Sequence, residues 1–187
     1  IKKKVIPPQS WRNINNHFLE VLNSDWYKKL CLLQDFINVY TVLFYKNKGI
    51  TTMHLPITTG AVSSPMGLGS DSQPVKIKMF DIDTYLADSM QFMLEYGCRI
   101  NGKGAYYIMP SFRGEKADDR HLCQFYHSEA EIVGRLQDVM NLVEEYVRFL
   151  SVNLIDNFNE LEDMCGDISH IDKLANAADI YKSCGTC

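Results

Sequence analysis

Apolar residues recur at helical intervals in two long stretches of the chain. Within residues 26–48 this spacing joins Leu30, Leu33, Ile37, Tyr40 and Phe44. Within residues 133–158 it joins Leu136, Met140, Val143, Val147, Leu150 and Leu154. Side chains three and four residues apart share one face of an α-helix, so both stretches are predicted to be amphipathic helices. Asp25 is expected to cap the first helix, and Gly49 is expected to end it in the left-handed conformation.

Short segments between these helices have the composition of strands. They are residues 50–57 (ITTMHLPI), 75–80 (VKIKMF), 84–87 (TYLA), 105–115 (AYYIMPSFRGE) and 123–132 (CQFYHSEAEI). Pro56 restricts the first to a sheet edge or a strand end, because proline has no N–H to donate. In the last two segments successive residues alternate in character, and a charged loop separates them, which predicts a hairpin. Because connections this short permit only antiparallel pairing, the sequence predicts an α+β fold, an antiparallel β-sheet flanked by helices.

The remaining segments are organised around these elements. Residues 60–74 concentrate glycine, serine and proline, which indicates a loop that can serve as a lid. A helix is expected to begin after Asp88 or Ser89 and to run to Gly97. The chain is expected to divide into an N-terminal arm, a core and a weakly specified helical tail, residues 1–25, 26–160 and 161–187.

Composition is typical of a globular protein. Of the 187 residues, 46% are hydrophobic and 22% are charged, which suffices for one buried core. No apolar run approaches the roughly 20 residues that cross a bilayer, and no secretion signal follows the N-terminal lysines. We therefore expect a soluble, cytoplasmic protein without a membrane partner. A net charge of −4 and a pI near 5.7 provide no basic field, so charge does not argue for nucleic acid.

Several common site motifs are incomplete or missing. No G-x-G-x-x-G opens a helix after a strand and no G-x-x-x-x-G-K-[ST] occurs, which disfavours a Rossmann fold and a P-loop. The six cysteines are scattered, as reduced thiols are, so no disulfide framework is expected. Cys184 and Cys187 have the spacing of a redox or zinc pair, but no companion pair completes it. The sequence does not identify metal ligands.

The predicted hairpin carries an unusually polar face. Period-two geometry places on it Ser111, Arg113 and Glu115 from the first strand and Phe125, His127, Glu129 and Glu131 from the second. A guanidinium can fork onto a phosphate, an aromatic ring can stack on a planar base, and carboxylates can accept an amino group. A solvated sheet face with salt bridges explains the same alternation, and composition does not decide between the two interpretations.

The order of residues in the hairpin favours a nucleotide site. Residues 112–115 (FRGE), a short loop, residues 120–125 (RHLCQF) and then Glu129-x-Glu131 together resemble motif 2 of the class II aminoacyl-tRNA synthetases, in the aspartyl/asparaginyl branch. The family normally has glutamate before the phenylalanine, whereas this chain has Gln124. What that carboxylate does in tRNA-charging relatives, including handling of the RNA end, is therefore not implied for this chain.

The resemblance implies a role for four hairpin residues in binding ATP. Arg113 would hold the α-phosphate and the carboxylate of the reacting pair, as the catalytic residue. Glu115 would contact the adenine amino group, and His121 would reach the distal phosphates. Phe125 would stack on adenine. The resemblance also implies Mg²⁺ as a cofactor beside ATP.

Two upstream segments agree with this family. Residues 26–57 are similar to motif 1, a helix and a strand with a proline that build the dimer interface, which implies a homodimer. Residues 86–91 (LADSMQ) are similar to the Ser-Pro-Gln segment of the branch, and residues 67–74 (GLGSDSQP) occupy the place of its flipping loop. The candidate amino-acid-binding residues are Ser70, Asp71, Ser72, Ser89, Gln91 and Glu129.

Each of these amino-acid-binding assignments has a structural alternative. Ser89 with Asp88 serves equally well as a helix cap. Gln91 is compatible with a surface position, and Asp71 with the start of a turn.

The resemblance stops before the third motif. No G-x-G-x-x-R occurs before Cys187, so a class II core assembled from this sequence is incomplete. Because about 25 residues precede motif 1, we also expect no OB barrel in this sequence. Without that arginine, the chain alone is expected to be a poor catalyst of adenylate formation. Three explanations remain open: the third motif lies on another chain, the natural protein is longer, or the domain binds its ligands without catalysis.

Three functions follow as hypotheses from the resemblance. The first is ATP-dependent activation of aspartate, or a close relative, as an adenylate for an amide-forming ligase, as in synthetase-like asparagine synthetases that lack the anticodon-binding domain. The second is a catalytically incomplete module that dimerises and serves binding or regulation. The third is a fragment of an aspartyl- or asparaginyl-tRNA synthetase, with tRNA as a less favoured partner.

Overall fold

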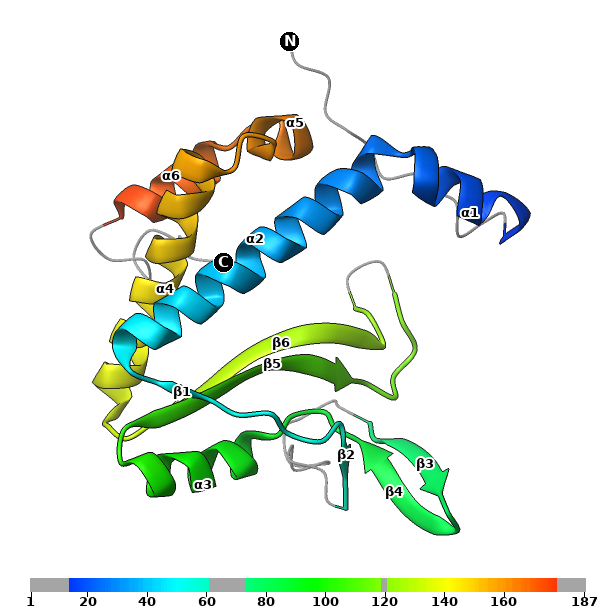
Figure 1. The fold of residues 1–187 in the computed structure, drawn as a ribbon, viewed down its shortest axis with the longest axis vertical. Helices are drawn as coiled ribbons and strands as arrows, with labels where there is room; N and C mark the ends of the chain where they lie inside the picture. Colours follow the sequence, from blue (N-terminus) through cyan, green and yellow to red (C-terminus); the bar gives the residue numbers. More distant parts are fainter. Residues whose placement is uncertain (1–13, 61–72, 119–120, 178–187) are drawn as a thin grey trace. The chain divides into compact units, whose positions relative to one another are not determined.

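The computed structural model describes residues 14–60, 73–118 and 121–177, and Figure 1 shows their secondary structure. These residues form two compact units. The first combines the described residues up to Phe44 with those from Arg135 onward, and the second is Tyr45–Gly134. The candidates Ser70, Asp71 and Ser72 lie outside the described residues. Within the described ranges, no helix is both long enough and apolar enough to cross a membrane.

The first unit is helical. Its elements are α1 (Ile14–Asn23), α2 (Asp25–Lys48), α4 (Leu136–Asn157), α5 (Leu161–Cys165) and α6 (Ser169–Asn176), with the last residues of α2 belonging to the second unit. Both long helices predicted from apolar spacing are thus confirmed. The predicted stop of α2 is also confirmed, because Gly49 has φ +68°. The predicted cap was wrong by one residue: Trp26 N donates to Ser24 Oγ at 3.2 Å, so Ser24 caps the helix.

Aromatic side chains form the interior of this unit. Phe36 on α2 stacks on Tyr40 with ring centroids 4.2 Å apart, and it meets Phe158 at 5.3 Å. Phe158 belongs to a buried cluster with two residues of α5, Leu161 and Met164. The apolar face predicted for α2 is therefore the face that packs against α4 and α5, which is how an amphipathic helix is stabilised.

The second unit contains two small sheets. One has the order β1 (Thr51–Thr52), β5 (Gly104–Phe112) and β6 (Gln124–Ile132), and the other has the order β2 (Thr58–Thr59), β4 (Ile82–Leu86) and β3 (Val75–Met79). All pairs are antiparallel except β1 with β5, which is parallel. The exception is a correction to the prediction. The connection from β1 to β5 contains the second sheet and a helix, and a crossover of that length permits parallel pairing.

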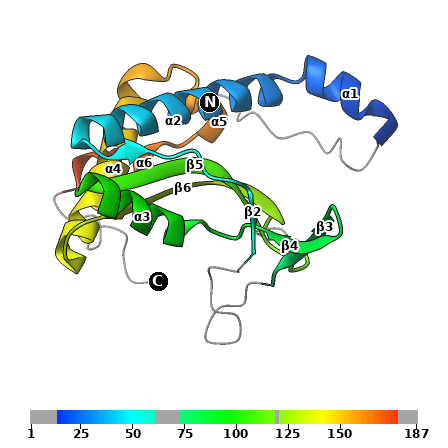
Figure 2. The same cartoon turned by 60° about the horizontal axis from the view of Figure 1, so that its bottom comes forward.

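The core of this unit lies between the helix α3 (Gln91–Asn101) and one face of β5, as Figures 1 and 2 show from two directions. It comprises Ala87, Met90, Leu94, Ala105, Tyr107 and Met109. Gly97, which was predicted to end the helix, lies next to Ala105 of this core. A Cβ on Gly97 would overlap Met53 Sδ and lie 2.5 Å from Ala105 Cβ, so the glycine serves close packing. The helix ends at Gly102, which has φ +71°.

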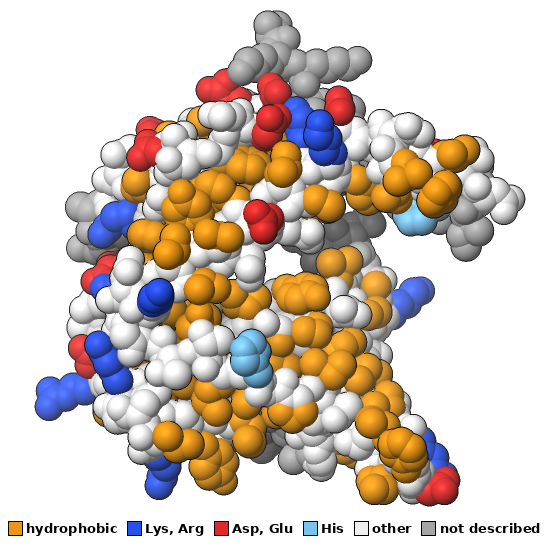
Figure 3. All heavy atoms as spheres, in the orientation of Figure 1, with side chains coloured by type: hydrophobic (Ala, Val, Ile, Leu, Met, Phe, Trp, Pro, Cys, Tyr) orange, Lys and Arg blue, Asp and Glu red, His pale blue; other side chains and the backbone are white. Residues whose placement is uncertain are grey.

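The β3–β4 hairpin ends in an apolar tip. Its turn is Phe80-Asp81, with φ of +48° and +65°, whereas the predicted strands 75–80 and 84–87 left residues 81–83 between them. Two successive left-handed residues make the tightest hairpin turn, which lets β4 begin at Ile82. Phe80 is 95% exposed, and Figure 3 shows the hydrophobic side chains gathered at this tip, at the lower right.

Replacing Leu94 by alanine tests the α3 core. Leu94 is 0% exposed, so Leu94→Ala is expected to lower the free energy of unfolding by about 2–5 kcal/mol through lost burial and the cavity left behind. Urea unfolding followed by circular dichroism measures the change. Ile100→Ala is the control, because Ile100 is on the same helix and 82% exposed. Equal losses in the two variants would contradict this core.

Candidate functional site

The register of the β5–β6 hairpin determines which side chains share a face. Ser111 pairs with Phe125, Met109 with His127, Tyr107 with Glu129 and Ala105 with Glu131. Directly opposed residues of an antiparallel pair lie on the same face, so this register confirms the polar face predicted from alternation. The first strand is shorter than predicted, since β5 ends at Phe112, and only Arg113 N continues the ladder, donating to Cys123 O at 2.8 Å.

Arg113 and Phe125 meet where the hairpin strands end. The guanidinium carbon of Arg113 lies 5.1 Å from the ring centroid of Phe125, within the range of a cation–π contact. Arg113 Nη1 donates to the carbonyl oxygens of Asp88, at 2.8 Å, and Phe112, at 3.0 Å. Both polar contacts use one nitrogen of the guanidinium, so the edge formed by Nε and Nη2 has no partner among the described residues. The predicted cation and ring are thus brought together.

Glu115 is held two residues further along, against the segment that leads into β3. Its Oε1 accepts the N–H of Gln73 at 2.9 Å, and Gly114 N donates to Gln73 O at 2.8 Å. A Cβ on Gly114 would lie 2.8 Å from Pro74 O, so this approach requires glycine. Glu115 Oε2 is buried and has no hydrogen-bond partner among the described residues. A buried acceptor without a donor is costly, and a ligand N–H would satisfy it.

Among the described residues, the side-chain partner of His121 is Asp118, and not Arg113 or Phe125. It lies in the loop between β5 and β6, where its Nδ1 is 2.9 Å from Asp118 Oδ1 and its backbone N–H donates to the same oxygen at 2.8 Å. Its side chain is 76% exposed. The described contacts of His121 are therefore those of a local turn, and its assignment to the distal phosphates of ATP stays a prediction.

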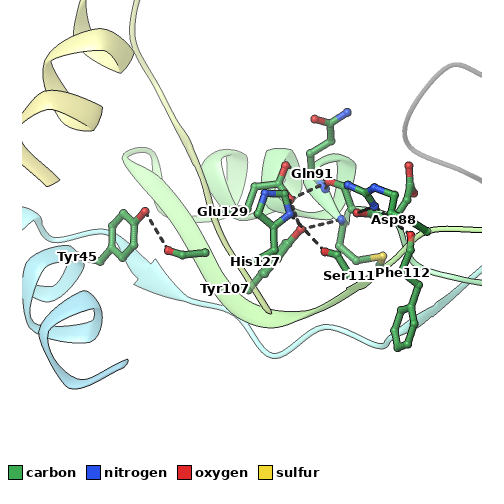
Figure 4. A network of polar contacts seen from close by, with 12 residues as sticks. Tyr45, Asp88, Gln91, Tyr107, Ser111, Phe112, His127 and Glu129 are labelled. Atoms are coloured by element: carbon green, nitrogen blue, oxygen red, sulfur yellow. Dashed lines mark hydrogen bonds and ion pairs between the residues drawn. The ribbon is translucent and has the colours of Figure 1, made fainter. Parts of the chain in front are cut away.

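Glu129 is the centre of a second polar group on the same sheet face, shown in Figure 4. Ser89 Oγ donates to both of its carboxylate oxygens, at 3.0 and 2.8 Å. Tyr107 OH donates to Glu129 Oε2 and accepts the N–H of Met90 at 2.9 Å. Ser89 Oγ also accepts the N–H of Gln91 at 3.1 Å. The N-cap of α3 is Met90, so Ser89 contacts the first residue of the helix from one position before the cap, and the same hydroxyl contacts Glu129. The structure thus joins two predicted amino-acid-binding residues, Ser89 and Glu129.

Gln91 begins α3 beside this group. Its backbone contacts Ser89, while its side-chain amide extends away from the Glu129–Tyr107 contact in Figure 4. The structure therefore does not place this amide on Glu129, and its contact with a substrate stays a prediction.

Tyr107 was not predicted to belong to the site, and Ser111 and His127 were predicted to lie on the polar face without a role. Tyr107 stands in an apolar strand and is buried, so its sequence context indicates core packing. Its position four residues before Ser111, and therefore on the polar face, was the available signal. His127 Nδ1 lies 3.3 Å from Ser111 Oγ and 3.7 Å from Glu129 Oε2.

Burial controls the protonation of this face. It raises the pKa of the Tyr107 phenol, and the hydrogen bond to Glu129 raises that pKa further, so the phenol remains a donor at neutral pH. Burial also raises the pKa of Glu131, with added repulsion from Glu129 and Glu95. The face therefore has a cationic end at Arg113 and an acid-rich end at Glu129 and Glu131.

The two expected cofactors fit these residues differently. For ATP, the structure offers a guanidinium edge, an aromatic ring and the buried acceptor Glu115 Oε2. For Mg²⁺, the described part of the chain contains no group of three His, Cys, Asp or Glu side chains placed to hold a metal ion. No chemical step is therefore assigned to a metal.

Comparison with known proteins agrees with the fold and the motifs. The family model described as tRNA synthetases class II (D, K and N) matches residues 11–182. The crystal structure of asparaginyl-tRNA synthetase from Pyrococcus horikoshii complexed with asparaginyl-adenylate is similar, with a TM-score of 0.73 and 22% sequence identity, over 97% of this chain and 42% of that chain. Asparaginyl-tRNA synthetase from Entamoeba histolytica is similar with a TM-score of 0.67 and 21% identity, over 84% of this chain and 35% of that one.

A putative aspartyl-tRNA synthetase from Leishmania major Friedlin is also similar, with a TM-score of 0.62 and 22% identity, over 74% of this chain and 26% of that one. The chain therefore spans less than half the length of each of these proteins. At these identities the likeness shows a shared fold, that of the class II catalytic core. Because the family model matches almost the whole chain, the protein belongs to the class II tRNA synthetases of the aspartate, lysine and asparagine group.

Proposed function

We propose that this chain binds ATP and an acidic amino acid, activates a carboxylate of that amino acid as an adenylate, and passes it to an amine to form an amide. The observation that carries the proposal is the arrangement on one sheet face. Arg113 and Phe125 meet at the end of the hairpin, and Glu129 accepts hydrogen bonds from Ser89 and Tyr107 further along it. Adenylate formation and amide formation are both part of the proposal, because this chain spans less than half the length of the similar synthetases.

Arg113 is the residue we assign to the phosphate. Two backbone carbonyls hold its Nη1, so the guanidinium is positioned before a ligand arrives and its Nε/Nη2 edge can fork onto the α-phosphate. Activation forms a bond from a carboxylate oxygen to the α-phosphorus and breaks the bond to pyrophosphate. Donors fixed where negative charge develops lower that barrier without reorganisation, and this is the share we assign to Arg113.

Phe125 and Glu115 are assigned to the adenine. One face of the Phe125 ring is already covered by the Arg113 guanidinium, so a purine would stack on the opposite face or displace the cation. The exocyclic amine of adenine is a donor, and it would satisfy Glu115 Oε2, which is buried and has no hydrogen-bond partner among the described residues.

Glu129 is assigned to the amino acid. Its carboxylate is oriented by Ser89 and Tyr107, and a carboxylate held in this way can accept an ammonium group as well. Among the described residues Arg113 is the cation on this face, so the reacting carboxylate of the substrate would lie toward it. Asp71 and Gln91 are retained as proposed contacts of the amino acid.

The acceptor is proposed to be an amine because of Gln124. This residue begins β6, directly before Phe125, where the tRNA-charging branch normally has the glutamate that the resemblance connects with the RNA end. Replacing that acid by an amide removes a reason to expect RNA. The asparaginyl-tRNA synthetases among the similar structures keep tRNA charging as a competing proposal, which assays with tRNA and with ammonia would separate.

A second candidate function is a synthetase-like module that binds without catalysis. The observation that favours it is His121, which pairs with Asp118 in the exposed loop rather than with the Arg113 group. Binding of ATP without exchange of pyrophosphate would support this module over the ligase.

Arg113→Ala tests the phosphate assignment. It is expected to weaken ATP binding by about 2–3 kcal/mol, because a charge-assisted hydrogen bond is lost, and calorimetric titration measures this. Arg99→Ala removes an exposed arginine of α3 in the same unit and is the control, expected to bind ATP as the unchanged chain does. ATP binding unaffected by Arg113→Ala would remove the basis of the proposal.

Glu129→Gln tests the amino-acid assignment. Glutamine keeps an oxygen for Ser89 and Tyr107 but removes the charge, so aspartate is expected to bind roughly 10-fold to 100-fold more weakly, with ATP affinity unchanged. Competition with radiolabelled aspartate at saturating ATP gives the affinity. Glu144→Gln on α4 is the matched control. A parallel loss of ATP and aspartate binding would indicate general damage instead of a substrate contact.

Association of two copies through motif 1 is the proposed assembly. Apolar residues of α2 remain exposed in one chain, namely Leu32, Val39, Val42 and Leu43. Burial of such a stripe against a second copy would stabilise a dimer. Sedimentation equilibrium is expected to give the mass of two chains, and Leu43→Glu is expected to shift it toward one. The mass of a single chain at micromolar concentration would contradict this assembly.

A further inference from the structure

His127 is a polar residue of the site face that the proposed function leaves without a task. It lies on β6 between Phe125 and Glu129 and contacts both. Its ring centroid is 5.8 Å from that of Phe125, and its Nδ1 is 3.7 Å from Glu129 Oε2. Figure 4 shows it over β5 and β6 beside Tyr107 and Glu129.

Two side chains lie beside Nδ1 of His127, and Nε2 has neither of them as a neighbour. Nδ1 faces the Glu129 carboxylate and lies 3.3 Å from the buried hydroxyl of Ser111. Either atom can be the donor in the Ser111 contact, so we assign the ring proton to Nδ1 on the ground that an ionised Glu129 carboxylate only accepts hydrogen bonds. The lone pair is then on Nε2. Since 35% of the His127 side chain is exposed, a ligand on the sheet face can reach the ring.

The position of His127 matches the reacting end of the proposed ligand. Same-face residues of a strand follow one another at about 6.6–6.8 Å. With adenine at Phe125 and the amino acid at Glu129, the acyl–phosphate junction would lie between them, over His127. Arg113, on the neighbouring strand end, would remain on the phosphate side of that junction.

We propose that His127 Nε2 is the general base that accepts the proton of the attacking amine when the adenylate is converted to an amide. The inference rests on the proposed function and names its acceptor class, ammonia or a small primary amine. Glu129 pairs with the resulting imidazolium through Nδ1, as a carboxylate does when it orients and stabilises a catalytic histidine.

The step balances with these groups alone. The neutral amine attacks the acyl carbon with its lone pair, and a C–N bond forms. The bond between the acyl carbon and the phosphate oxygen breaks, and its electron pair leaves with AMP. The surplus proton on nitrogen passes to His127 Nε2, and the imidazolium later releases it to solvent.

The test bypasses ATP by supplying synthetic β-aspartyl-adenylate with methylamine as the acceptor. Formation of the methylamide is measured above the uncatalysed background with the full chain. His127→Asn is the informative variant, because the asparagine amide can retain the Nδ1 contact with Ser111 and Glu129 but offers no base. It is expected to lower the rate at least about 100-fold, the usual share of a general base, while the affinity for the adenylate changes little.

Two further variants separate base catalysis from structural damage. His127→Ala in added imidazole is expected to recover part of the lost rate, which a purely structural role would not allow. His170→Gln removes an exposed histidine of α6 and is expected to react as the unchanged chain does. Thermal melting of each variant confirms that it is folded.

The outcomes separate this inference from the proposed function. Equal rates for His127→Asn and the unchanged chain would overturn the inference, and so would a chain that does not accelerate the methylamine reaction at all or that transfers the acyl group only to tRNA. Loss of the rate with imidazole rescue supports it. Absence of ATP–pyrophosphate exchange in the unchanged chain would instead overturn the ATP step, whatever the result with the synthetic adenylate.

Discussion

The antiparallel register of β5 and β6 is the constraint on which the candidate site depends. It places Tyr107 opposite Glu129 and Ser111 opposite Phe125, so two stretches of sequence contribute to one face. A shift of the register by one residue would turn one strand's set of side chains to the other face. The packing of α3 on that same face holds the register, because Leu94 and Gly97 fit against β5 with no space for slippage.

Burial makes the polar groups of this face depend on one another. Ser89, Tyr107 and Ser111 are all buried, and each contributes a hydroxyl group to a hydrogen bond. Unmade hydrogen bonds are costly in such a place, so the network is stable only when it is complete. Glu129 therefore acts as a structural acceptor and as the proposed substrate contact through the same two oxygens.

The opposite charges at the two ends of the face give the proposed chemistry its direction. The guanidinium of Arg113 attracts phosphate and carboxylate, while Glu129 and Glu131 attract an ammonium or an amine. An adenylate has its anionic part next to its acyl part, and the face presents its cation and its acids in that order. His127 stands between them, where an acceptor nitrogen would lose its proton.

The sequence by itself determined the elements and the family of this protein. Apolar spacing is a local property, and it defined α2 and α4, while alternation defined the shared face of residues 125, 127 and 129. The residues of motif 2 stand close together in the chain, so the resemblance needed no tertiary information. The family match later confirmed it.

Only the tertiary structure decided which of these side chains meet. It placed Arg113 on Phe125 and Ser89 on Glu129, and it left His121 in a local pair with Asp118. It also showed that Tyr107, on a strand of apolar residues, donates a hydrogen bond to Glu129, and that Gly97 allows α3 to pack closely on β5. Gly97 packs against Ala105 and Met53, which are 8 and 44 positions away in the sequence, and the contacts of Glu129 with Ser89 and Tyr107 join different elements. These partners depend on how helix and sheet pack, which no local pattern in the chain encodes.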